Sequence, residues 1–93
     1  MSEADKMFEE LNFKKYVDDE ELKDGFEYSS YSKLSRQWRK DGYLEITFSS
    51  KFKEITILFK DKERADQLPI YLEVEELKAI NKKVEELRRV EKV

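Results

Sequence analysis

The sequence predicts an α+β fold: an antiparallel sheet of three to four strands, a β-meander, flanked by an N-terminal and a C-terminal helix. Apolar residues recur every three or four positions near both ends of the chain, which is the helical period. In the middle of the chain they recur at every second position, which is the strand period. We expect residues 1–93 to form a single α+β domain with the element order α-β-β-β-β-α.

The first helix is predicted directly after Ser2, a favourable N-cap residue, with Asp5 three positions on in a near relative of the capping box. One helical face is apolar and consists of Ala4, Met7, Phe8 and Leu11. Asn12 tolerates the left-handed conformation that ends many helices. The helix is therefore expected to end just before this residue.

The middle of the chain reads as strands. Residues 43–48 and 55–59 alternate apolar with polar side chains and are joined by a short link that is polar apart from Phe52, which predicts a hairpin. Residues 26–31 alternate more weakly, and residues 13–17 are expected to form a fourth, short strand. Residues 40–42, Lys-Asp-Gly, are typical of a turn before the strand that starts at Tyr43.

The second helix is predicted from about residue 74 to about residue 90, with Val74, Leu77, Ile80, Val84 and Leu87 on one face. Together the elements predict a core with the following members: Met7, Phe8, Leu11, Leu44, Ile46, Phe48, Ile55, Ile57, Phe59, Leu77, Ile80, Val84 and Leu87.

The composition excludes several functional classes. The chain has no Cys and no His, so thiol nucleophiles, thiolate metal sites and imidazole bases are absent. No apolar run approaches the roughly 20 residues of a membrane helix. The first 25 residues are acidic and contain no apolar signal segment. We expect a cytoplasmic protein with no cofactor, no metal and no small-molecule substrate.

Two short patterns invite a catalytic or metal-binding interpretation. Ser30 and Lys33 have the S-x-x-K spacing, but it belongs to a nucleophilic site only when the Ser begins a helix and partner motifs follow. Residues 18–21 are four consecutive acids, whereas calcium loops place their ligands at alternate positions around a Gly. A solvated acidic turn is the simpler interpretation. The sequence thus predicts no catalytic residue and no enzyme.

The most unusual segment is 31–43, where cations and aromatic side chains alternate and no acid occurs before Asp41. Cations neutralise phosphates and aromatic faces stack on bases, so the segment is a candidate binding patch for single-stranded nucleic acid. Its members are Tyr31, Lys33, Arg36, Trp38, Arg39, Lys40 and Tyr43. The alternative is a polar hairpin loop, and an acidic protein partner would suit the same patch.

The C-terminal helix offers a second candidate surface. Leu87, Val90 and Val93 extend towards the end of the chain, where they can run beyond a small sheet. Apolar side chains left uncovered there would favour self-association. Packing of the helix within the domain is the alternative interpretation.

Two segments resemble a known group of proteins. Residues 4–15 resemble the pattern A-D-x-M-F-E-x-L-G-[FY]-x-K, and residues 75–87 resemble E-L-x-A-I-N-K-K-x-x-E-L. Both patterns are similar to those of small uncharacterised phage and prophage proteins of Gram-positive bacteria. The resemblance implies a bacterial host cytoplasm but no particular activity. It departs at Asn12, where the pattern usually has Gly, and residues 34–41 have no counterpart in it.

Two hypotheses about function follow. The first is a protein-interaction module without catalytic activity, acting as a homodimer or by binding a host factor. The second is a weak binder of single-stranded nucleic acid through residues 31–43. The sequence pI near 5.2 disfavours the second, since nucleic-acid-binding domains are usually basic.

Overall fold

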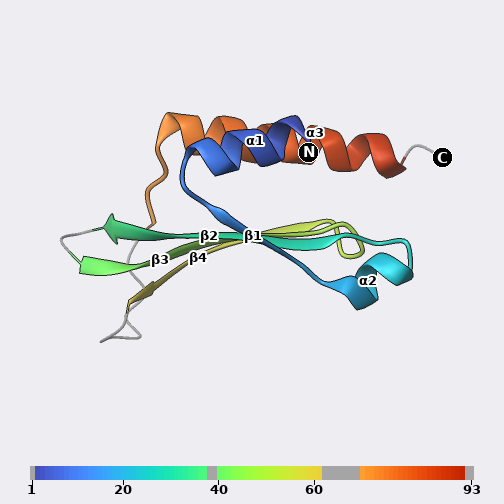
Figure 1. The fold of residues 1–93 in the computed structure, drawn as a ribbon, viewed down its shortest axis with the longest axis horizontal. Helices are drawn as coiled ribbons and strands as arrows, with labels where there is room; N and C mark the ends of the chain where they lie inside the picture. The colour runs from blue at the N-terminus through green and yellow to red at the C-terminus, as the bar shows by residue number, and fades with distance from the viewer. Residues whose placement is uncertain (1, 38–39, 62–69, 92–93) are drawn as a thin grey trace. The chain divides into compact units, whose positions relative to one another are not determined.

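The structure, a computed structural model, describes residues 2–37, 40–61 and 70–91. It confirms the α+β class and an antiparallel meander with one helix before it and one helix after it in the chain, and it adds a five-residue helix between the first two strands. The elements, in chain order, are α1 (Glu3–Glu10), β1 (Lys14–Val17), α2 (Asp19–Lys23), β2 (Tyr28–Gln37), β3 (Lys40–Ser49), β4 (Glu54–Asp61) and α3 (Val74–Glu91) (Figure 1).

The chain divides into two compact units. The helical unit combines Met1–Phe13 with Leu72–Val93 and contains α1 and α3. The sheet unit, Lys14–Tyr71, contains α2 and the four strands. The expectation that residues 1–93 form one domain stays a prediction.

The ends of α1 are built as the sequence predicts. The Ser2 side chain accepts a hydrogen bond from the Asp5 N–H at 3.0 Å, which makes Ser2 the N-cap. Asn12 has a φ of 70°, the left-handed conformation that ends the helix. The chain then folds back, because the Phe13 N–H donates to the Phe8 carbonyl and the two rings meet edge to face, 5.3 Å apart.

Helix α3 lies beside α1 in the helical unit (Figure 1). The Ala4 N–H donates to a Glu86 carboxylate oxygen at 2.8 Å, and Lys82 lies 3.2 Å from the carboxylate of Glu3. Ala4 and Ala79 are fully buried. Small side chains let two helix backbones approach closely, so the two alanines are well suited to this packing.

The predicted apolar stripe of α3 is only partly correct. Ile80 is buried, Val84 and Leu87 are half-buried, but Leu77 and Val74 are 49 % and 69 % exposed. The prediction of Leu77 as a core residue is therefore wrong. The buried face of α3 comprises Glu76, Ala79, Ile80 and Lys83, so Glu76 and Lys83 are buried in place of their predicted neighbours Leu77 and Val84. Glu76 is tolerated there because its carboxylate accepts the Glu73 N–H at 2.8 Å, so it caps the helix.

The sheet has the strand order β1-β2-β3-β4, with every neighbouring pair antiparallel. Strand β1 is short and pairs only with Ser29–Ser32 of β2. Strands β2 and β3 pair along their whole length, from Tyr28↔Ser49 to Gln37↔Lys40. The weakly predicted strand 26–31 is thus considerably longer in the structure.

The predicted turn at residues 40–42 is wrong, because these residues belong to β3. Gly42 is buried opposite Asp61, where an added Cβ would collide with the carbonyl oxygen of Lys60 and the ring of Phe59. A glycine is needed at position 42 because β3 and β4 approach each other closely there, and the chain does not reverse its direction at this residue.

The two faces of the sheet differ in exposure. The buried face contains Tyr31, Leu44, Ile46 and Phe48, each at most 1 % exposed, which confirms the three predicted core residues of β3. We call the opposite side the open face. Ile57 and Phe59 of β4 are half-buried, and Ile55 is 45 % exposed. Ile55 is therefore wrongly predicted as core, because among the described strands β4 is an edge strand with a neighbour on one side only.

Candidate functional site

The structure splits the basic and aromatic segment between the two faces of the sheet. Residues 31–37 and 40–43 are paired strands, in which successive side chains point to opposite faces. Tyr31 and Lys33 share the buried face, since they oppose Ile46 and Leu44. Arg36 and Tyr43 lie on the open face. These side chains therefore form no single patch.

Tyr31 has a structural role. Its side chain is 1 % exposed and its ring meets that of Phe48 edge to face at 5.8 Å. The ammonium group of Lys15 lies 5.8 Å from the Tyr31 ring centre. A buried ring offers no face to a nucleic-acid base, so the prediction of Tyr31 as a stacking residue is wrong.

The remaining members of the segment are only partly visible. Trp38 and Arg39 lie outside the described residues, and of Lys40 only the backbone is described. For the C-terminal candidate surface, Leu87 is half-buried, Val90 is described by its backbone alone, and Val93 lies outside the described residues. The self-association surface at Leu87, Val90 and Val93 stays a prediction.

The S-x-x-K spacing does not bring its residues together. Ser30 lies on the open face, where its hydroxyl is 3.0 Å from that of Thr47. Lys33 points to the other face. A serine activated by this lysine is therefore incompatible with the geometry, because nucleophile and base must be within hydrogen-bond reach.

The acidic run 18–21 has a local structural role. Asp18 accepts a hydrogen bond from the Glu20 N–H at 3.0 Å, and its carbonyl accepts the Leu22 N–H. These are the bonds of an N-cap residue, and they start α2. No cluster of three possible His, Cys, Asp or Glu metal ligands occurs in the part of the chain that the structure describes.

The open face carries a small group of exposed apolar side chains, which we call the open-face cluster: Leu34, Tyr43 and Leu58. Leu34 and Tyr43 are directly opposed on β2 and β3, and Leu58 is the diagonal neighbour of Tyr43 on β4. Their exposed fractions are 71 %, 43 % and 43 %. Leu58 is apolar at a position of β4 where the alternation around Ile57 predicts a polar residue. This departure from the alternation indicates an apolar side chain on the open face.

Two further tyrosines lie on the open face, separated from the open-face cluster by a polar strip. Tyr16 on β1 is 63 % exposed and Tyr28 on β2 is 39 % exposed. Between them and the cluster, the hydroxyls of Ser30 and Thr47 approach each other. The open face therefore combines apolar and aromatic contact area with small hydroxyl side chains.

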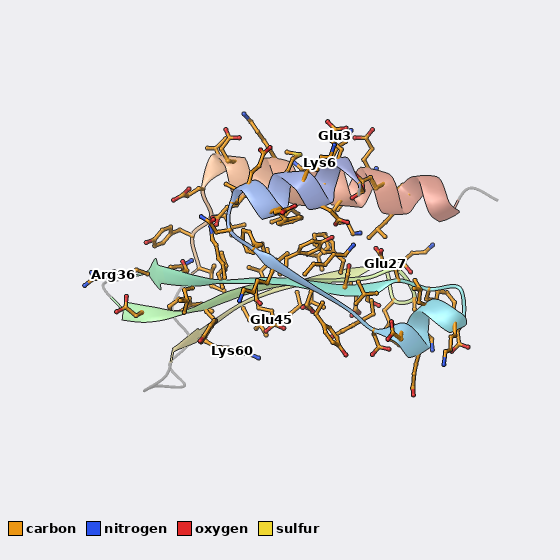
Figure 2. The ribbon with its side chains drawn as sticks, viewed as in Figure 1. Glu3, Lys6, Glu27, Arg36, Glu45 and Lys60 are labelled. Carbon is orange, nitrogen blue, oxygen red and sulfur yellow. The ribbon has the colours of Figure 1, made fainter. Side chains whose placement is uncertain are left out.

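The charges of the open face balance one another. Lys60 lies 3.3 Å from Glu45, and both side chains extend from the same side of the sheet (Figure 2). Arg36 lies 3.8 Å from Asp41. In the described strands, the cations Lys14, Arg36 and Lys60 share this face with the acids Asp41, Glu45 and Glu54. The face therefore has no excess of positive charge to attract phosphates.

Comparisons of this chain with protein-family models, with curated proteins and with solved structures give no match. Among the helices in the described ranges, none is both long and apolar enough to cross a membrane.

Proposed function

We propose that the protein is an interaction module without catalytic activity that binds a protein partner on the open face of its sheet. The observation that carries the proposal is the open-face cluster: Leu34, Tyr43 and Leu58 are exposed side by side on three paired strands. Rigid strands hold such side chains in place before binding, which lowers the entropic cost of association. The resemblance to small phage and prophage proteins fits an accessory role of this kind in a bacterial cytoplasm.

The chemistry of the face favours a protein over a nucleic acid. Tyrosine and leucine suit the dehydrated centre of a protein interface, and the paired charges around them suit a polar rim. Binding of single-stranded nucleic acid needs unpaired cations along the backbone path, whereas Arg36 and Lys60 each have an acid beside them. The partner expected here presents an apolar surface with few charges at its centre.

Affinity capture from nuclease-treated bacterial lysate tests the proposal. The wild type is compared with Leu34→Asp, which places a charge in the cluster at a 71 % exposed position. Leu22→Asp is the matched control, because Leu22 is a 53 % exposed leucine on α2, away from the strands. Circular dichroism verifies that both variants fold.

The proposal expects the same protein to be captured by the wild type and by Leu22→Asp, and to be lost with Leu34→Asp. Equal capture by all three chains would refute the open face as the binding surface. Material that is released by nuclease in a parallel capture would instead identify nucleic acid as the partner.

A further inference from the structure

The two edges of the sheet differ in how they are protected against pairing with another chain. Strand β1 is four residues long and carries Lys14 and Lys15, and short, lysine-rich edges resist strand addition. Strand β4 is eight residues long, and residues 55–59, Ile-Thr-Ile-Leu-Phe, contain neither charge nor proline. An edge of this kind is a template for a further strand.

The backbone hydrogen bonds of the sheet establish which groups of β4 face outwards. The Ser50 N–H donates to Glu27 beside the end of β3, and the backbone groups of successive strand residues alternate in direction. The even-numbered residues of β3 therefore face β2 and the odd-numbered ones face β4. Their partners on β4 are even-numbered, for example Lys60 opposite Tyr43. It follows that Ile55, Ile57 and Phe59 direct their N–H and C=O groups to the outer edge of β4, where none of the described strands pairs with them.

We propose that a second copy of this chain pairs with that edge, β4 antiparallel to β4, with the two-fold axis at Ile57. In this register Ile57 opposes Ile57 of the second copy, and Ile55 opposes Phe59. These are the residues whose backbone groups face outwards, so the opposed pairs exchange hydrogen bonds. The two meanders then become one continuous sheet.

Charge complementarity selects this register. Glu54 opposes Lys60 of the second copy at both ends of the pairing, on the open-face side of the strands. In a symmetric pairing, the two-fold axis can move along β4 only by whole residues. A smaller shift would set side chains of the buried face opposite side chains of the open face. Centring it on Thr56 sets Glu54 against Leu58, and centring it on Leu58 sets Ile55 against Asp61. Only the register centred on Ile57 sets Glu54 against Lys60 and keeps Ile55 against an apolar residue.

The pairing also covers apolar surface that the isolated chain leaves exposed. Ile55 is 45 % exposed, and Ile57 and Phe59 are half-buried, although all three lie on the otherwise buried face. Side chains of the second copy would extend that face across the edge. This inference goes beyond the proposed function, because it concerns the edge of β4 rather than the open-face cluster.

A mixing experiment with charge reversals tests both the dimer and its register. Glu54→Lys and Lys60→Glu each create like-charged pairs at both ends of the homodimer, whereas a mixture of the two variants restores opposite charges in the heterodimer. We expect each variant alone to raise the dimer dissociation constant about tenfold or more, and the equimolar mixture to recover most of the dimer. Sedimentation velocity measures the populations, and Lys14→Glu on β1 is the control reversal.

A wild type that remains monomeric at millimolar concentration overturns the proposal, as does a mixture that dimerises no better than its components.

Hydrogen exchange provides an independent readout that does not depend on variants. The amides of Ile55, Ile57 and Phe59 are expected to become protected as concentration rises, while those of Thr56 and Leu58 are protected throughout. Dimerisation without this alternating protection would overturn the pairing. Because Leu34→Asp leaves β4 intact, its capture result and the dimer result can fail separately.

Discussion

Leu44 lies on the buried face and Leu58 on the open face of two adjacent strands, and truncating each to alanine tests the assignment of those faces. Leu44 on β3 is fully buried, whereas Leu58 on β4 is 43 % exposed. Leu→Ala removes three carbons, worth about 0.8 kcal/mol each when they are fully buried. For Leu44 the cavity left behind adds to this, giving a loss of about 2–5 kcal/mol in unfolding free energy.

For Leu58 only a little over half of the transfer free energy applies, and solvent fills the space left on the open face. The expected loss is about 1–1.5 kcal/mol. Urea denaturation followed by far-UV circular dichroism measures both values in the same sheet unit. Equal losses for the two variants would contradict the difference in burial between the two faces, and a larger loss for Leu58→Ala would show that the faces are assigned the wrong way round.

Three further outcomes are expected. Gly42→Ala should destabilise the protein by about 1–3 kcal/mol in thermal unfolding, because its Cβ would collide with the Lys60 carbonyl. Leu77→Ala should cost only about 1 kcal/mol in the same assay, since Leu77 is 49 % exposed and about half of the transfer free energy of its side chain applies. Glu3 raises the pKa of Lys82 above 10.5 through a hydrogen bond, so this contribution to stability is complete below pH 10.5 and is lost as the pH rises through the raised pKa. Glu3→Gln should therefore weaken the alkaline decline in unfolding free energy, and an unchanged pH profile would contradict the contact.

The fold was predictable because its strongest signals are local. Ser2 and Asn12 mark the ends of α1 by their capping chemistry, and β3 and β4 alternate clearly around a short polar link. Strand β2 is harder to recognise, since its serines and charged residues hide the alternation. Its length is set by pairing with β3, a contact between distant residues that no local pattern shows.

The candidate site was less predictable for the same reason. Because residues 31–37 form a strand, successive side chains alternate between its two faces, and Tyr31 and Arg36 lie on opposite faces of the sheet. The candidate patch at residues 31–43 is therefore divided between the two faces. The open-face cluster depends on register, because Leu34, Tyr43 and Leu58 come from three strands. On α3, counting apolar side chains favoured Leu77, whereas the structure buries Glu76 beside it as a helix cap.

If the open face binds a protein partner, a photocrosslinking residue at position 43 will capture that partner. An aromatic crosslinking amino acid replaces Tyr43 in the cluster, and the same amino acid replaces Phe52, a 66 % exposed residue in the β3–β4 connection, as the control. In bacterial lysate, the account predicts a discrete protein adduct from position 43 and none of that mass from position 52. Absence of the adduct at position 43, the same adduct from both positions, or an adduct digested by nuclease would contradict the account.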